Sequence, residues 1–222
     1  MTKTPLTAAL LICSTTFLSG CLIHIDSGQG FEGDGISSVL GNIDVDEHDY
    51  AGNISSVNGN VELDSHARAD DISIVNGSLD IEDHVQVNSI DIVNGDIDAG
   101  THFRVAQSIE TVNGDIFIDN KGQITNSIET INGDIVLSTT HIGKNIESLN
   151  GDISVEGESV IVGDIIYHKP ESRWFDTDSM PTLSIASTVL LEGNIILERP
   201  VELNLENADH QQKVIVRYSS KQ

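Results

Sequence analysis

Four histidines in the first half of the chain recur at a constant interval of 18 residues: His48, His66, His84 and His102. Asp46, Asp64 and Glu82 stand two positions before the first three of them. Imidazole nitrogens and carboxylate oxygens are common ligands of zinc, nickel and copper. We therefore expect weak binding of a divalent metal, first of all by His66 and His84 together with the two acids that precede them. The alternative is that duplication copied these loop residues without a function.

A second row places carboxylates at nearly the same interval, each directly after a repeated glycine: Asp96, Asp115, Asp134 and Asp152. Adjacent carboxylates in such a row repel each other by about 1 kcal/mol in water, and calcium would relieve this repulsion. The two-glycine nonapeptide of calcium-binding repeats is absent from the sequence. An aspartate that follows glycine also readily accepts a backbone hydrogen bond, so a structural role is favoured over calcium.

The sequence lacks the residue patterns of serine hydrolases, zinc peptidases and phosphate-binding loops, and we expect no enzymatic activity. A glycan-active β-helical enzyme is the remaining catalytic alternative. Such enzymes need basic residues beside clustered aspartates, but residues 36–164 contain 24 acids and only 4 bases. The net charge of −24 for the whole chain also argues against nucleic acid as a partner.

These residues belong to a repeat that is marked by the dipeptide Asn-Gly. The dipeptide begins at Asn58, Asn76, Asn94, Asn113, Asn132 and Asn150, at intervals of 18, 18, 19, 19 and 18 residues. Each unit reads approximately Ile-x-x-Val-Asn-Gly-Asp-Ile-x-Ile and continues with eight or nine variable residues. The fourth, eighth and tenth positions form apolar columns with polar residues between them. This alternation indicates short, half-buried strands rather than helices.

The constant unit length indicates stacked coils. One unit cannot bury its apolar residues alone, whereas seven units about 4.8 Å apart form an interior about 30 Å long. We therefore predict an all-β, single-domain β-solenoid, or parallel β-helix, of about seven coils of 18–19 residues over 36–164. The asparagines are expected to form an amide ladder along one corner. An antiparallel meander of Asn-Gly hairpins is the alternative, although a meander does not need units of equal length.

The recurring Val/Ile/Leu-Asn-Gly-Asp-Ile steps resemble adhesin-type bacterial protein families of unknown function, whose domains are stacked β-solenoids of short coils. The resemblance covers residues 36 to about 165 of the 222. It implies the solenoid fold and, with less specificity, a role in adhesion, because a fold alone does not determine activity.

Residues 1–20 have the layout of a secretory signal, with Lys3 ahead of an apolar stretch and small residues before Cys21. The tetrapeptide Leu-Ser-Gly-Cys that ends at Cys21 resembles the lipobox of bacterial lipoproteins. The resemblance implies that this cysteine carries acyl chains such as palmitate and becomes the first residue of the mature protein. Leu22 stands where an aspartate would favour the inner membrane, so the outer membrane is the expected location. An ordinary cleaved signal is the alternative.

The two ends of the repeat differ from its body. Residues 21–35 are expected to be the lipidated cysteine and a flexible, glycine-rich tether. Residues 165–222 are expected to form a degenerate coil, an inserted loop and a C-terminal cap that covers the last coil. Trp174 and Phe175 in the inserted loop are candidate partner-binding residues, although a covering role is favoured for this segment.

The leading interpretation is a lipid-anchored, non-enzymatic protein of the cell envelope, attached to the membrane through its N-terminal lipid. Its flat β faces would serve adhesion, or would bind or scaffold a protein or glycan of the envelope. A periplasmic or surface module for divalent metals is the second interpretation, and the glycan-active enzyme is the third. Apart from a weakly bound metal, no cofactor is expected.

Overall fold

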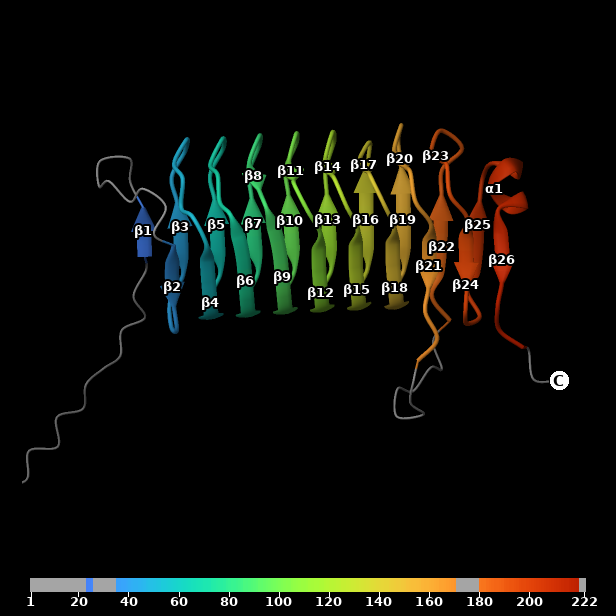
Figure 1. Cartoon of the computed structure of the whole chain (residues 1–222), viewed down its shortest axis with the longest axis horizontal. Coiled ribbons are helices and arrows are strands. Elements are labelled where there is room, and N and C mark those ends of the chain that lie inside the picture. Colours follow the sequence, from blue (N-terminus) through green and yellow to red (C-terminus); the bar gives the residue numbers. More distant parts are fainter. Residues whose placement is uncertain (1–22, 26–34, 171–179, 220–222) are drawn as a thin grey trace, which may run out of the picture.

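The computed structural model describes residues 23–25, 35–170 and 180–219. They form a parallel β-solenoid of about nine turns, built from two ten-stranded sheets and one six-stranded sheet. Successive coils lie side by side along the long axis of the molecule (Figure 1). The pairings between these strands are parallel and join equivalent positions one coil apart. The solenoid prediction is thus confirmed, and the meander of hairpins is excluded.

Each full coil contributes one strand to each of the two large sheets. Sheet A consists of β1 (Ile23–Ile25), β3 (Ile43–Val45), β5 (Val61–Leu63), β7 (Leu79–Ile81), β10 (Ile97–Ala99), β13 (Ile116–Ile118), β16 (Ile135–Ser138), β19 (Ile153–Glu156), β22 (Thr182–Ile185) and β25 (Glu202–Leu205). Sheet B consists of β2 (Ile36–Ser38), β4 (Ile54–Asn58), β6 (Asp71–Asn76), β9 (Ser89–Asn94), β12 (Ile109–Asn113), β15 (Ile128–Asn132), β18 (Ile146–Asn150), β21 (Ile165–Tyr167), β24 (Ile195–Leu197) and β26 (Val214–Val216).

The third side of the coil is narrower. Sheet C consists of β8 (Gln86–Val87), β11 (Arg104–Val105), β14 (Gln123–Ile124), β17 (His141–Ile142), β20 (Val160–Ile161) and β23 (Leu190–Leu191). Its inward residues, such as Val105 and Ile124, close the core between the two large sheets. The core is therefore a continuous column of Ile, Val and Leu, enclosed on three sides.

The columns of the repeat divide between the interior and the surface. The eighth and tenth positions, which lie in sheet A, face inward, and Ile116 and Ile118 are almost fully buried. The fourth position, in sheet B, does not face inward: Val57, Val75 and Val93 are 37 to 41% exposed. The first position of the same strand is buried, and side chains alternate along a strand. The third position must therefore face the core, and the fourth must face outward.

Polar ladders hold the corner between sheets B and A. Each asparagine of the Asn-Gly series after Asn58 donates from Nδ2 to Oδ1 of the asparagine one coil earlier, over 2.9 to 3.1 Å. The buried Arg199 ends this ladder, because its Nη1 donates to Oδ1 of Asn150. The predicted amide ladder is thus confirmed, and an arginine supplies the hydrogen bond that a further asparagine would have made.

The coils continue beyond the regular repeat, which is why the structure has more turns than the seven predicted. Strands β21 to β24 keep buried inward apolar residues although the Asn-Gly marker is lost, and β25 and β26 pair onto them as the last two strands. Strand β21 ends at Tyr167 and β22 begins at Thr182, and of the residues between them 168–170, 180 and 181 are described. The short helix α1 (Ala208–Gln212) begins at Asn207, whose side chain accepts a hydrogen bond from the backbone N–H of Asp209, and β26 follows it.

Three residues of the expected tether are described as a strand, while 21–22 and 26–34 lie outside the described residues. Residues 23–25 form β1, which extends sheet A by pairing in parallel with β3. Its Ile-His-Ile sequence has the alternation of a strand, and the open edge of the first coil offers unpaired backbone groups. No helix in the described ranges has the length and apolar character to cross a membrane.

Candidate functional surfaces

The predicted histidine column is a stack of imidazole rings at one corner of the coil. Ring centroids of successive histidines lie 4.8, 4.8 and 4.4 Å apart, and neighbouring planes are within 18° of parallel. All four histidines have φ between 61° and 70°. Lys121, Thr139 and Gly157 have positive φ one, two and three coils further on, so the corner requires a left-handed residue at this point but does not require an imidazole.

Two of the acids that stand two residues before the histidines, Asp64 and Glu82, have their carboxylates in other contacts. Glu82 accepts hydrogen bonds from the backbone and the hydroxyl of Ser65. Asp64 lies with Asp44 and Asp46 in a separate group of carboxylates, and partial burial followed by the charge of Glu82 raises the pKa of Asp64. His66 and His84 are neighbours, as predicted, and their rings stack. The acid whose carboxylate lies beside the histidine column, however, is neither Asp64 nor Glu82.

Glu47, directly before the first histidine of the column, is that acid. Its Oε1 lies 3.5 Å from Nδ1 of His48. One ligand atom each of Glu47, His48 and His66 lie within 4.8 Å of one another, and all three side chains are exposed. The sequence contains this residue next to the histidine, but spacing alone does not show which way a side chain turns at a corner.

The carboxylates after the repeated glycines have a structural role. Oδ1 of Asp96, Asp115 and Asp134 each accepts the backbone N–H of the aspartate in the next coil, over 2.8 to 2.9 Å. Asp152 accepts the N–H of Thr182 in the same way. These bonds link successive coils, which supports the structural interpretation over calcium.

A furrow on the outer face of sheet B is a surface feature that the sequence interpretation missed. One wall is the apolar row, formed by the fourth repeat positions Val75, Val93, Val112 and Ile131. The other wall is the acidic row, formed by the second positions Asp91, Glu110 and Glu129. The furrow has a volume of about 270 Å³. It could have been found from the sequence by applying the strand alternation from the buried first position.

The acidic row of Asp91, Glu110 and Glu129 has no ion-pair partner in the part of the chain that the structure describes. Partial burial, with a contribution from Asp71, raises the pKa of Asp91. Partial burial followed by repulsion from Glu147 and Glu110 raises the pKa of Glu129. The carboxylates of the acidic row therefore attract a cationic group that approaches the furrow.

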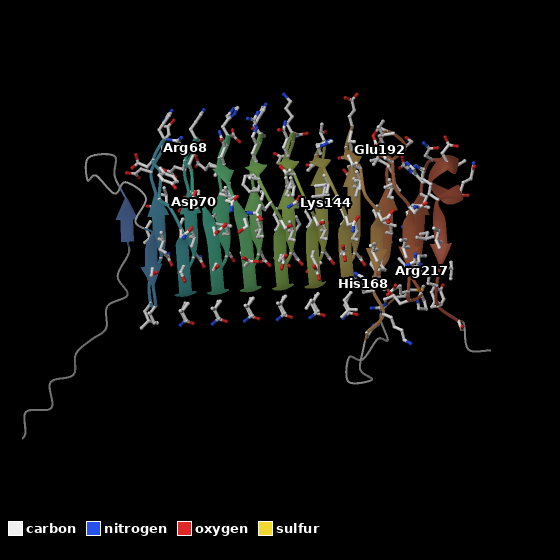
Figure 2. All side chains as sticks on the ribbon, in the orientation of Figure 1. Arg68, Asp70, Lys144, His168, Glu192 and Arg217 are labelled. Carbon is white, nitrogen blue, oxygen red and sulfur yellow. The ribbon has the colours of Figure 1, made fainter. Side chains whose placement is uncertain are left out.

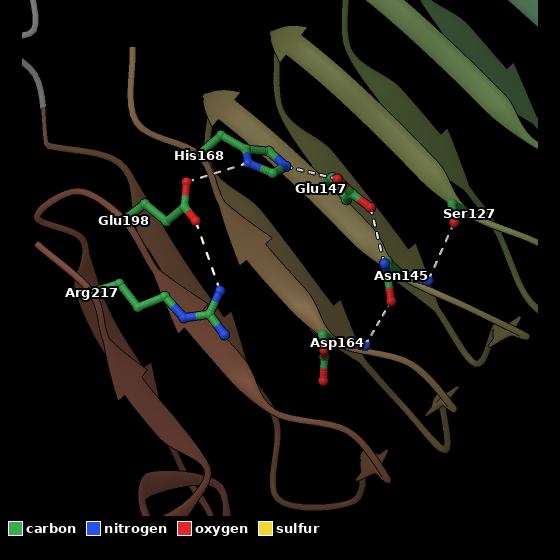
Figure 3. A network of polar contacts seen from close by, with 7 residues as sticks. All are labelled: Ser127, Asn145, Glu147, Asp164, His168, Glu198 and Arg217. Carbon is green, nitrogen blue, oxygen red and sulfur yellow. Dashed lines mark hydrogen bonds and ion pairs between the residues drawn. The ribbon is translucent and has the colours of Figure 1, made fainter. Parts of the chain in front are cut away.

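At its C-terminal end, the same row meets the imidazole of His168 (Figure 3). Nε2 of His168 lies 2.7 Å from Oε2 of Glu147, which follows Glu129 in register. Nδ1 of His168 is 3.6 Å from Glu198, and Arg217 approaches the other oxygen of Glu198 at 3.9 Å. Figure 2 places His168 and Arg217 near the C-terminal end of the solenoid, far from Arg68. His168 thus contacts the carboxylate that continues the acidic row. Arg217 contacts Glu198, on the other side of His168.

Three predicted site residues cannot be placed. Cys21, Trp174 and Phe175 lie outside the described residues. Acylation of the cysteine and partner binding by the two aromatic residues therefore stay predictions.

The fold and these surfaces define the chain as an all-β parallel solenoid protein with an acidic, partly apolar outer face. Comparison of the chain with protein-family models, curated proteins and solved structures finds no match. The solenoid agrees with the fold that the adhesin-type resemblance implies. Membership of such a family stays a prediction.

Proposed function

We propose that this chain is a non-enzymatic, lipid-anchored protein of the bacterial cell envelope that binds another envelope component on the outer face of sheet B. The observation that carries this proposal is the furrow. It combines exposed apolar side chains with carboxylates that form no ion pair among the described residues. Exposed apolar surface beside polar groups is typical of interaction sites.

The charge of the furrow indicates the chemistry of the partner. An extended segment lying along the furrow would direct alternate side chains to opposite walls. Apolar residues would contact the apolar row, and Lys or Arg residues would contact the acidic row. The contact between His168 and Glu147 supports this choice, because a basic side chain already lies against the next carboxylate of the row. The partner is therefore an envelope protein with a segment of alternating basic and apolar residues, and the role is adhesion or scaffolding.

The lipobox-like sequence before Cys21 supports the anchor, and Leu22 after it supports the outer membrane. Cys21→Ser is expected to leave the protein unprocessed or soluble, because acylation requires the thiol. Fractionation of cells that express each form, with the size of the product read on a gel, makes this measurement. Recovery of the serine variant in the membrane fraction at the processed size would contradict the lipid anchor.

Binding in the furrow can be measured with a labelled synthetic peptide of alternating lysine and valine, by fluorescence anisotropy. Glu110→Lys is expected to weaken binding about tenfold, equivalent to about 1.4 kcal/mol, because it reverses the charge at the centre of the acidic row. The substitution should preserve the fold, since Glu110 is exposed and lies in register between Asp91 and Glu129.

The matched control is Asp98→Lys, which makes the same change of net charge on the outer face of sheet A. It is expected to leave the affinity for the peptide nearly unchanged. A peptide of alternating glutamate and valine should not bind. If Asp98→Lys weakens binding as much as Glu110→Lys, the attraction is a property of the net charge and the proposed site is wrong.

A further inference from the structure

The first two coils of the histidine column bring together the donor atoms of a metal site. The carboxylate of Glu47 and one ring nitrogen each of His48 and His66 lie within 4.8 Å of one another. The two rings are parallel to within 4°, with centroids 4.8 Å apart. Two imidazoles and one carboxylate form a known ligand set of zinc sites that keep a position open for water.

The backbone does not explain why histidine stands in this column. The positive φ of the corner is adopted equally by Lys121, Thr139 and Gly157 in later coils. The side chains of His48 and Glu47 are 67% and 60% exposed, so their packing contributes little to stability. Conformation and burial thus permit an imidazole at this corner without requiring one, and the exposed ring nitrogens are accessible to a ligand.

The two ends of the column differ in their charge. Glu47 lies beside the first histidine. At the other end, burial and the positive charge of Lys121 lower the pKa of His102, while the nearby carboxylate of Asp83 raises it. That carboxylate accepts hydrogen bonds from the backbone and the hydroxyl of Thr101. The end with Glu47 therefore attracts a metal ion more strongly than the end with Lys121.

We propose that Glu47, His48 and His66 bind a divalent transition metal such as Zn²⁺, with water completing the coordination shell. Zinc–ligand bonds of about 2.0–2.1 Å place the ligands of a tetrahedral site about 3.3 Å apart. The three donors must therefore approach one another, and one ring must tilt out of the stack. Their exposure leaves them free to do so, and the site forms only when the metal binds. This site is independent of the proposed binding role of sheet B.

The test is calorimetry with Zn²⁺ on the full chain, purified in detergent without a histidine tag. One zinc ion per chain is expected. His48→Asn and His66→Asn are each expected to weaken binding roughly tenfold or more, and Glu47→Gln to weaken it as well. Asparagine is the right replacement, because it tolerates positive φ and so preserves the corner.

His102→Asn is the matched control, since it makes the same substitution in the same column and leaves the proposed ligands in place. It is expected to retain the affinity of the unchanged protein, and circular dichroism shows whether each variant keeps its fold. Three results would overturn the proposal: no heat with zinc, unchanged affinity in His48→Asn and His66→Asn, or an equal loss in His102→Asn. The last result would mean that zinc binds along the whole column without a preferred site.

Discussion

Ile116→Asp is expected to lower the free energy of unfolding by about 5 kcal/mol, a large part of the stability of an ordinary domain. Ile116 is fully buried in β13. It lies in register with Ile97 and Ile135 in the neighbouring coils. An aspartate at this point would place a carboxylate among isoleucines, with no group to pair with it. The loss is measured from urea unfolding followed by circular dichroism.

Phe117→Asp is the matched control, one residue further along the same strand. Phe117 is 40% exposed on the outer face of sheet A. Asp98 is its neighbour in register, and repulsion between like charges in adjacent strands costs at most about 1 kcal/mol. The control should therefore unfold at nearly the urea concentration of the unchanged protein. Equal losses in the two variants would show that the division of this strand into inward and outward residues is wrong.

The spacing of the Asn-Gly dipeptides is sufficient to predict most of the fold, because a coil that stacks on its neighbours must keep its length. It does not predict the number of turns. Strands β22 to β24 retain the inward apolar residues Leu183, Leu191 and Ile195 without the dipeptide. The interior of a solenoid requires apolar residues in register, whereas the asparagine ladder can end at Arg199. The Asn-Gly dipeptide is therefore lost from the sequence before the last coil is reached.

The fourth repeat position shows how an apolar column can be misread. Valine at this position resembles a core residue, but the buried first position places it on the opposite face of the same strand. Serine and threonine occupy many of the truly buried third positions, as at Ser56 and Thr111. Ser56 donates its hydroxyl to the carbonyl of Gly59, which makes its burial possible. Residue type alone therefore predicts the wrong face for the third and fourth positions. The alternation of side chains along the strand, counted from the buried first position, predicts the right one.

The histidine column is predictable from the sequence as a row, but its acidic neighbour is not. In an extended strand, a residue two positions away shares the same face. At this corner the histidine is in the left-handed conformation, so that rule no longer applies. Glu82 can also bond to Ser65 in the preceding coil, and only the folded structure shows which of these contacts forms. The same reasoning explains why Glu47 was not among the predicted ligands.

The glycines of the Asn-Gly dipeptides allow the coils to stack as closely as they do. A Cβ atom added to Gly114 would lie only 1.9 Å from the carbonyl oxygen of Gly95 in the preceding coil. The obstacle is backbone that is itself held in the sheet ladders, so it cannot move aside without separating two coils. The same approach of 1.9 to 2.2 Å recurs along the column from Gly59 to Gly151.

Gly114→Ala is therefore expected to destabilise the solenoid by about 3 kcal/mol or more, at the upper end of what overpacking usually costs. Gly100→Ala is the control, because its added Cβ would lie 2.9 Å from a carboxylate oxygen of Asp83 and no closer than 3.1 Å to the backbone of the preceding coil. Neither glycine has the positive φ that would add backbone strain, so the two variants differ mainly in the backbone contact between coils. Urea unfolding of both proteins measures the difference. A loss for Gly100→Ala as large as that for Gly114→Ala would mean that close stacking is not what the glycine column provides.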